Sequence, residues 1–228
     1  MQSIKVKICG QTSVEGCDLS LKYGADYLGV VLNVPASPRS LTEEQAKPIF
    51  EKHGRRTFML TCNAPADDGY FNLVKALNPC ALQLTGKETW RTTRDIKRAL
   101  GLPLFKSIHL PPAGEGEADL AQYIGVMEEY ARAGMVNGFI LDTAAGGLFG
   151  GTGKKSDWGL AAKIVAESPQ PVYLAGGIGP DNVAEALKVP GILGIDLASG
   201  VEEKKGVKSE AKLAELFEKI RKSIGEGG

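Results

Sequence analysis

The sequence of 228 residues lacks the patterns that several classes of protein require. It has two histidines and four cysteines, with no C-x-x-C pair, so neither a zinc site nor a disulfide framework is predicted. Lys and Arg number 27, as do Asp and Glu, so no net charge attracts nucleic acid or a membrane surface. No apolar run approaches the roughly 18 residues of a membrane span, and residues 1–7 do not resemble a signal peptide. We therefore expect a cytoplasmic protein with no nucleic acid or membrane partner, in which any anion is bound by a local site.

What the sequence does contain is a rhythm of short β-branched runs and helical stretches, repeated about every 20 to 30 residues, which is typical of parallel βα units. Eight strands are predicted, namely Ile4–Cys9, Tyr27–Leu32, Thr57–Thr61, Ala81–Leu84, Leu104–Ile108, Gly138–Asp142, Val172–Ala175 and Gly194–Leu197. Eight such units can close into an α/β fold of the (β/α)8 TIM-barrel type, and the chain length suits one barrel domain over residues 1–228. An open, doubly wound sheet is the alternative.

Two segments show a clear helical period, and two others are predicted loops. The apolar stripes are Leu120, Tyr123, Ile124, Met127 and Ala131, and Leu213, Leu216, Phe217, Ile220 and Ile224. Both follow i, i+3, i+4, i+7 spacing and should pack against the outer wall of a barrel. Residues 111–116 are predicted to form a flexible loop. The glycine-rich residues 146–153 follow the sixth strand, where a barrel would place an active-site cover.

In a barrel, catalytic groups collect where strands end, because the βα loops share one face. The first predicted strand ends at Cys9 and the sixth at Asp142. A thiol and a carboxyl across one mouth could act as base and acid if their environments bring each pKa close to the working pH. The alternatives remain open at this point, because a lone cysteine is more often inert packing and a lone aspartate often caps a loop.

Two glycine-containing strand ends favour an anion site. Gly176-Gly177 follows the seventh strand, and Ser199-Gly200 follows the eighth. Backbone N–H groups of such turns can approach a phosphate, and a helix beginning after the eighth strand would add its positive end. Arg39, between Pro35 and Pro38, could grip a carboxylate with two hydrogen bonds, although most loop arginines are simply solvated.

Seven short motifs in order resemble the phosphoribosylanthranilate isomerase family over nearly the whole chain. They are Lys7-Ile8-Cys9-Gly10, Ser37-Pro38-Arg39, Gln83-Leu84-x-Gly86, Leu141-Asp142-Thr143, Gly150–Lys154 with Asp157-Trp158, Ala175-Gly176-Gly177 with Asn182-Val183, and Gly194-Ile195-Asp196 with Ser199–Glu202. Each motif is only two to six residues long, so the resemblance depends on their order.

The resemblance implies an Amadori rearrangement in tryptophan biosynthesis, without metal or organic cofactor, in a monomer or homodimer. N-(5-phosphoribosyl)anthranilate would become 1-(2-carboxyphenylamino)-1-deoxyribulose 5-phosphate. Asp142 would be the general acid and Cys9 the general base. The substrate-binding residues implied are Arg39 for the anthranilate carboxylate, Gly176, Gly177, Ser199 and Gly200 for the phosphate, and Asp196 for a polar contact at the same mouth.

The sequence departs from the family pattern on the side that would hold the aromatic ring. Thr85 stands where the family usually has histidine, and Ser156 lies in a segment that usually reads Lys-Thr-Phe-Asp-Trp. These changes leave two alternatives open: a paralogous barrel isomerase that acts on another phosphoribosyl amine, and a non-catalytic phosphosugar-binding regulator.

Overall fold

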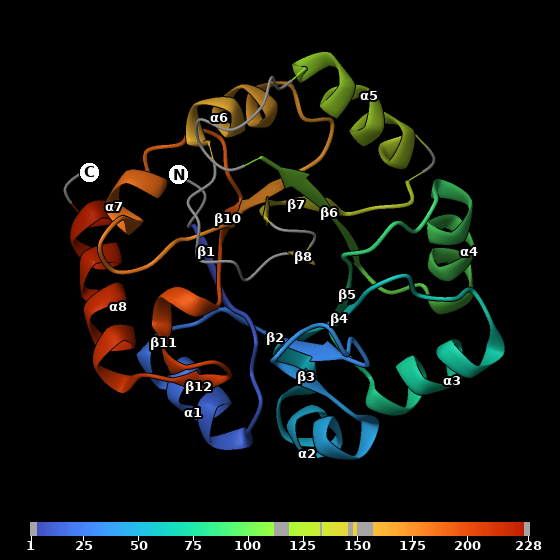
Figure 1. Ribbon diagram of the computed structural model, residues 1–228, viewed down its shortest axis with the longest axis horizontal. Coiled ribbons are helices and arrows are strands. Elements are labelled where there is room, and N and C mark those ends of the chain that lie inside the picture. Colours follow the sequence, from blue (N-terminus) through green and yellow to red (C-terminus); the bar gives the residue numbers. More distant parts are fainter. Residues whose placement is uncertain (1–3, 112–118, 133, 146–147, 150–156, 226–228) are drawn as a thin grey trace.

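Eight parallel strands form a closed ring in the computed structural model, and helices surround the ring (Figure 1). The model describes residues 4–111, 119–132, 134–145, 148–149 and 157–225. The ring strands are β1 (Lys5–Ile8), β2 (Tyr27–Leu32), β4 (Thr57–Thr61), β5 (Ala81–Leu84), β6 (Leu104–Leu110), β7 (Gly138–Ala145), β9 (Val172–Leu174) and β10 (Gly194–Leu197). Pairing of β1 with both β10 and β2 closes the barrel. The predicted barrel is therefore confirmed, and the open sheet is wrong.

The remaining helices and short strands lie around this ring. The helices are α1 (Val14–Tyr23), α2 (Glu43–His53), α3 (Asp68–Leu77), α4 (Trp90–Leu100), α5 (Leu120–Ala131), α6 (Trp158–Glu167), α7 (Val183–Ala186) and α8 (Glu210–Gly225), with 3₁₀ turns η1 (Gly54–Arg56) and η2 (Ser199–Val201). Short strands are β3 (Ser40–Leu41) beside β2, β8 (Leu148–Phe149) beside β7, and the hairpin of β11 (Glu202–Lys204) with β12 (Val207–Lys208).

Helix starts are set by side chains that accept hydrogen bonds from the first turn, which otherwise has unpaired N–H groups. The caps are Ser13, Thr42, Asp67, Thr89, Asp119 and Asp157, for α1 to α6 in order. Thr42 and Gln45 also form a reciprocal capping box. Asp157, part of a family motif, thus has a local role at the start of α6.

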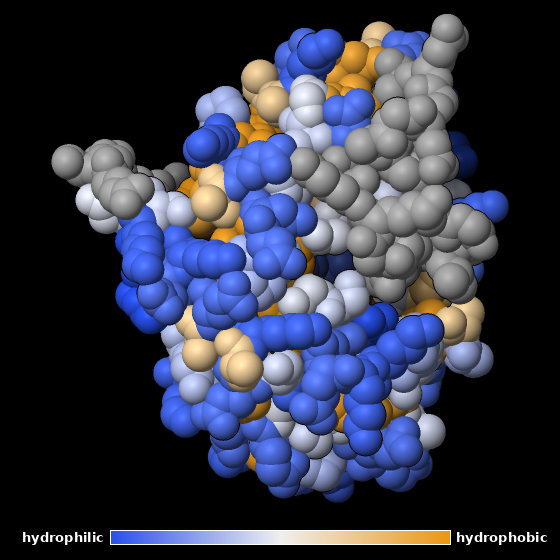
Figure 2. Space-filling view, turned by 60° about the vertical axis from the view of Figure 1, so that its left-hand side comes forward, coloured by the Kyte–Doolittle hydropathy of each residue, from blue (hydrophilic) through white to orange (hydrophobic). Residues whose placement is uncertain are grey.

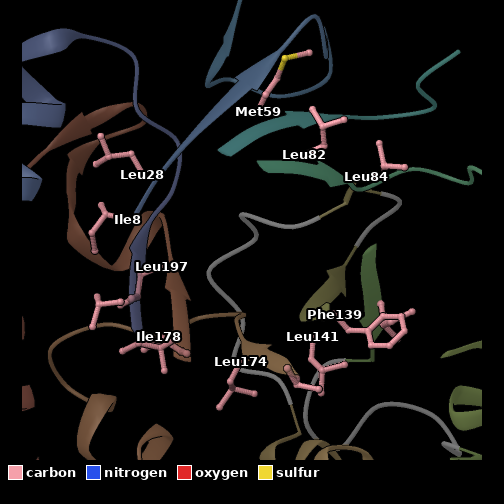
Figure 3. Close-up of a cluster of buried hydrophobic side chains, with 14 of the residues drawn as sticks. Ile8, Leu28, Met59, Leu82, Leu84, Phe139, Leu141, Leu174, Ile178 and Leu197 are labelled. Carbon is pink, nitrogen blue, oxygen red and sulfur yellow. The ribbon is translucent and has the colours of Figure 1, made fainter. Parts of the chain in front are cut away.

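The alternation of side chains along each strand divides the core into two layers. The larger layer lies between strands and helices; Figure 3 shows part of it, with Leu28, Leu82 and Leu174 from different strands of the ring. The predicted stripe of α8 packs here through Leu213, Leu216, Phe217 and Ile220, as predicted, but Ile224 is half exposed and that part of the prediction is wrong. The stripe of α5 packs here through Leu120, Tyr123, Ile124 and the fully buried Met127, whereas Ala131 is partly exposed and lies outside this cluster.

The smaller layer fills the barrel interior with aromatic rings. Phe58 lies 5.3 Å from Tyr27 and 5.1 Å from Phe105, and Phe105 lies 5.8 Å from Tyr173, measured between ring centroids. Such tilted and edge-on contacts suit the charge distribution of aromatic rings. The aromatic rings therefore fill the barrel interior at their height along its axis. A site inside the barrel has room only between these rings and the carboxyl ends of the strands.

Several predictions fall on or beside residues outside the described ranges. The residues outside the described ranges include 112–116 of the first predicted loop, 146–147 and 150–153 of the second, and Ser156. The assignment of residues 1–228 to one domain stays a prediction.

None of the described helices is long and apolar enough to cross a membrane. On the face shown in Figure 2, hydrophobic residues are scattered among hydrophilic ones.

Candidate active site

One pocket at the carboxyl ends of the barrel strands gathers most of the predicted site residues. Its lining includes Cys9, Arg39, Asp142, Gly176, Gly177, Asp196 and Ser199. These side chains and backbone segments come from the ends of β1, β7, β9 and β10 and from the segment before β3. Gly200 does not appear in the lining; it packs against Ile178, where a side chain would collide with the backbone carbonyl.

Asp142 has the properties of a general acid. It lies on β7, beside His109 of β6 in the parallel register, and its Oδ1 accepts a hydrogen bond of 2.8 Å from the Thr143 amide. Burial raises the pKa of this carboxyl to about 6, the Thr143 hydrogen bond opposes the rise, and the negative charge of Asp196 adds to it. A carboxyl with a pKa near neutrality can hold a proton and still release it, as a catalytic acid must.

Cys9 lies directly after β1 and is 8% exposed, within the pocket. Burial raises the pKa of its thiol, while the positive charges of Lys7 and Lys208 and the Gly10 amide act in the opposite direction. The thiolate is therefore disfavoured by desolvation and favoured by two lysines. The structure thus surrounds the thiol with opposing influences, since Asp196 adds to the rise in its pKa.

Arg39 is held by a carboxylate of the protein itself. Its Nε and Nη2 donate to the two oxygens of Glu202 at 2.8 and 2.7 Å, and both side chains are almost completely buried. Glu202 also accepts from Lys208 at 3.0 Å. Burial alone would raise the pKa of Glu202, but the two cations hold it below its ordinary value. Arg39 thus reaches the pocket in a fixed orientation, with donors still available beyond the Glu202 pair.

Gly10 makes this approach of Arg39 feasible. Its φ of +70° lies in the left-handed region, and a Cβ at this position would collide with the Arg39 side chain. The glycine that follows Cys9 in the family motif therefore has a physical reason in this chain. It lets the arginine lie directly over the end of β1.

The loops after β9 and β10 have the geometry of an anion site. Gly176 and Gly177 have φ values of +87° and +67°, which L side chains rarely adopt. The Asn182 side chain ties this turn down by donating to the Gly177 carbonyl and accepting from the Gly179 amide, both at 2.9 Å. Ser199 begins the 3₁₀ turn η2 directly after β10, where the sequence predicted the start of a helix.

A chain of buried polar side chains crosses the barrel just above the aromatic layer. The fully buried Lys7 donates to Asp196 at 2.8 Å and to Gln83 at 3.0 Å, and Gln83 donates to Ser107 at 3.1 Å. Asp196 Oδ1 is buried and accepts no hydrogen bond from the described residues, although Asp196 lines the pocket. A buried oxygen without a donor is costly, so this atom marks a place where a bound hydroxyl or N–H would be stabilised.

Sequence reasoning missed the roles of Lys7, Gln83, Glu202 and Lys208. One signal could have found Lys7, because alternation along β1 places Lys7 and Cys9 on the same face of the strand, inside the barrel. The contacts of Glu202 and Lys208 had no such signal, since they arise only from the hairpin of β11 and β12. Thr85, the departure from the family pattern, lines the pocket, and its hydroxyl lies 3.4 Å from that of Ser107.

The fold and the site define a class: (β/α)8-barrel enzymes with a thiol and a carboxyl around one pocket at the carboxyl ends of the strands. Among the described residues, no group of three or more His, Cys, Asp and Glu side chains is placed to hold a metal ion.

Comparison with known proteins narrows this class to one family. The family described as PRAI, N-(5'-phosphoribosyl)anthranilate isomerase, matches residues 6–219. The N-(5'-phosphoribosyl)anthranilate isomerase of Beijerinckia indica is 34% identical over 220 residues, which cover 96% of this chain and 95% of that one. The chain belongs to the N-(5'-phosphoribosyl)anthranilate isomerase family.

Solved structures agree with this membership. The phosphoribosyl anthranilate isomerase of Thermus thermophilus superposes with a TM-score of 0.78 at 30% identity, covering 96% of this chain and 99% of that one. A second isomerase, described in complex with reduced 1-(o-carboxyphenylamino)-1-deoxyribulose 5-phosphate, has a TM-score of 0.76 at 24% identity and covers 98% and 100%. At this lower identity, the second structure shows that the two chains share a fold and no more.

Proposed function

We propose that this chain isomerises N-(5-phosphoribosyl)anthranilate to 1-(2-carboxyphenylamino)-1-deoxyribulose 5-phosphate in tryptophan biosynthesis, with Asp142 as general acid and Cys9 as general base. The observation that carries the proposal is the pocket itself, in which a carboxyl of raised pKa and a buried thiol line one mouth together with the loops of Gly176, Gly177 and Ser199. Family membership supplies the substrate class.

The first step requires a proton at the furanose ring oxygen. Asp142, with a pKa of about 6, retains a proton in part of the population at neutral pH and would donate it as the C1–O bond breaks. The nitrogen lone pair then forms the C1=N double bond, and the product is an open-chain iminium. Burial of the acid favours this transfer because the neutral carboxyl needs no solvation.

The second step removes the proton from C2, which the positive iminium makes acidic. The Cys9 thiolate would take this proton, and the C–H electron pair becomes the C1=C2 bond of an enolamine. Tautomerisation of the enolamine to the ketone completes the rearrangement, with no net oxidation. Deprotonation of a buried thiol requires nearby positive charge to offset the loss of solvation.

Both ends of the substrate would be held by groups already in place. The loops of Gly176, Gly177 and Ser199 suit the phosphate, and Gly200 packs closely against Ile178 and Gly179 of the loop after β9. The fixed guanidinium of Arg39 suits the anthranilate carboxylate. The unpartnered Asp196 Oδ1 would accept a hydrogen bond from a sugar hydroxyl or from the substrate amine.

The test supplies anthranilate, phosphoribosyl pyrophosphate and the transferase that joins them, and follows loss of the fluorescent intermediate after the chain is added. Turnover supports the proposal, and binding without turnover would favour a phosphosugar-binding regulator. Thr85 gives reason for a second arm with other phosphoribosyl amines. Faster turnover of one of these than of the anthranilate compound would favour the paralogous isomerase.

We further propose that the reaction needs no cofactor. We also propose that it takes place in the cytoplasm, because a substrate bearing a phosphate and a carboxylate does not cross membranes unaided. Activity that survives exhaustive chelation and dialysis is the result expected. A monomer or a homodimer remains the predicted assembly, which sedimentation would distinguish.

A further inference from the structure

The interior of the barrel contains a cation that the proposed reaction does not yet use. Lys7 lies on β1 two residues before Cys9, on the same face, and its side chain is fully buried. A buried ammonium is unfavourable unless charges and hydrogen-bond acceptors replace the water that it loses. An apolar residue would avoid this cost, so the neighbours of Lys7 must compensate its charge.

The surroundings of Lys7 hold the ammonium in one place. Asp196 and Gln83 accept its hydrogen bonds from two sides, and the ring of Phe58 lies 5.4 Å from its Nζ, within the range of a cation–π contact. Burial alone would lower the pKa of Lys7, but the charges of Asp196 and Cys9 raise it above its ordinary value. Lys7 is therefore a permanently charged group at the working pH.

The ammonium lies beside the thiol of Cys9. Gly29 on β2 sets an upper limit on their separation: a Cβ at Gly29 would lie 2.7 Å from the Cys9 Sγ and 3.0 Å from the Lys7 Nζ, so the two atoms are at most 5.7 Å apart. The two atoms thus share the small space that the absent side chain of Gly29 leaves. At such separations, in a site of low polarity, a full positive charge strongly favours an adjacent anion.

We infer that Lys7 is a positioning residue that stabilises the Cys9 thiolate, with Asp196 and Gln83 fixing its ammonium beside the sulfur. The inference rests on the proposed function, since it explains how Cys9 could serve as a base. It gives the buried charge pair of Lys7 and Asp196 two tasks. Asp196 orients the ammonium through Oδ2, and its Oδ1 remains free to accept from substrate.

Other charged groups near the thiol act more weakly or in the opposite sense. Burial is the largest influence on the pKa of Cys9, and Lys7 is the largest charge opposing it, followed by the repulsion of Asp196 and then the attraction of Lys208. Lys208 donates to the Cys9 carbonyl oxygen at 2.6 Å, so it contacts the backbone of this residue. The charged groups around the thiol, including those across the pocket, are Lys7, Arg39, Asp142, Asp196 and Lys208.

The test measures the thiol directly. The rate of Cys9 alkylation by iodoacetamide is followed against pH in the whole protein, and the Cys9 peptide is identified by mass so that the other three thiols do not contribute. In Lys7→Met the midpoint of this profile should rise by at least about one unit, which is a tenfold loss of thiolate at a given pH below it. At neutral pH, kcat should fall at least about tenfold and recover as pH rises, with KM changed less than about threefold.

Lys5→Met is the matched control. Lys5 lies on the same face of β1, about 13 Å from Cys9 along the strand, and pairs with Asp26 at 3.1 Å near the surface. Its loss should leave the Cys9 profile and kcat unchanged. If Lys7→Met folds poorly because Asp196 is left buried and unpaired, the double variant Lys7→Met/Asp196→Asn removes both charges, and its midpoint should still rise.

An unchanged midpoint in Lys7→Met, or in the double variant where the single one does not fold, overturns the inference. Failure of the proposed function gives a different result: full turnover in Cys9→Ser would remove Cys9 as base, whatever the alkylation profiles show. Loss of turnover in Cys9→Ser together with an unshifted profile in Lys7→Met would keep the proposed function and reject the role of Lys7.

Discussion

Two buried lysines, Lys7 and Lys106, each pair with a buried carboxylate, but they lie on opposite sides of the barrel wall. Lys106 points outward from β6 and donates to the carbonyls of Leu84 and Gly86 and to Glu88. Glu88 in turn accepts from backbone amides, and its carbonyl accepts from Tyr130. Every donor of this ammonium has a partner within the described protein.

The inner pair is left incomplete. Lys7 donates to two oxygens and lies beside a thiol, and Asp196 keeps one buried oxygen without a donor. The difference teaches how to separate structural from functional charge in this fold. A network that satisfies all its members ties loops to the barrel, whereas one that leaves an acceptor open at a pocket is built to receive something else.

The largest expected effect is on stability, at the outer pair. Lys106→Met would leave Glu88 charged and buried, so the free energy of unfolding should fall by about 3 to 5 kcal/mol. Urea denaturation measures it, and kcat per folded molecule should stay close to that of the parent. A large loss of kcat in the folded fraction would show that the outer pair also serves the reaction.

The next effect concerns the two groups proposed for proton transfer. Cys9→Ser and Asp142→Asn should each lower kcat at least about a hundredfold, because each removes acid or base assistance. Steady-state turnover of the fluorescent substrate measures this. A rate like that of the parent in either variant would remove that residue from the mechanism.

Asp142 should also destabilise the protein at high pH. Its folded pKa of about 6 lies above the value of roughly 3.9 of an unfolded aspartate, so its contribution is complete below pH 4 and lost as pH rises through 6. Asp142→Asn should therefore raise the free energy of unfolding by about 3 kcal/mol at pH 8 and hardly at all at pH 3. Urea denaturation at both pH values measures it, and an equal gain at both would contradict the assigned cause.

A smaller effect is expected where the arginine is held in place. Glu202→Gln should loosen Arg39 and raise KM about tenfold, with kcat changed less, because binding of the carboxylate depends on a fixed guanidinium. Glu203→Gln, an exposed neighbour on the same strand, is the control. A fall in kcat at constant KM would instead place Glu202 in the chemical step.

The smallest effect is expected at the barrel's opposite end. Lys5 and Asp26 are both about one-third exposed, so their pair contributes little. Lys5→Met should change the free energy of unfolding by less than about 1 kcal/mol, as urea denaturation would show. A change of several kcal/mol would mean that position on the inner face of β1, rather than burial, makes a lysine important here.

Much of the barrel was predictable because its signal is local. Four of the eight strand predictions match the structure at both ends, among them Thr57–Thr61, and the predicted stripe of α5 lies within the observed helix. Two strands run past their predicted ends, β6 to Leu110 and β7 to Ala145, because each gains hydrogen bonds from a neighbour. The strands β1 and β9 are instead shorter than predicted, at Lys5–Ile8 and Val172–Leu174. Thus periodicity predicted the elements, and pairing decided their lengths.

The candidate site divides in the same way. Cys9, Asp142 and the glycines of the two loops could be named in advance, because a parallel barrel brings all strand ends to one mouth. The partners of those residues could not. Glu202 meets Arg39 across 163 positions and Lys7 meets Asp196 across 189, and no local pattern encodes such distances.

By itself, then, the sequence determined the repeating βα units and the residues at the strand ends, since hydrophobic period is a property of neighbouring residues. Only the tertiary structure decided which charges face each other, how deeply the thiol and the acid are buried, and hence in which direction each pKa moves. The physical reason is that desolvation and Coulomb interactions depend on distance and burial in space, which the barrel creates when its first and last strands meet.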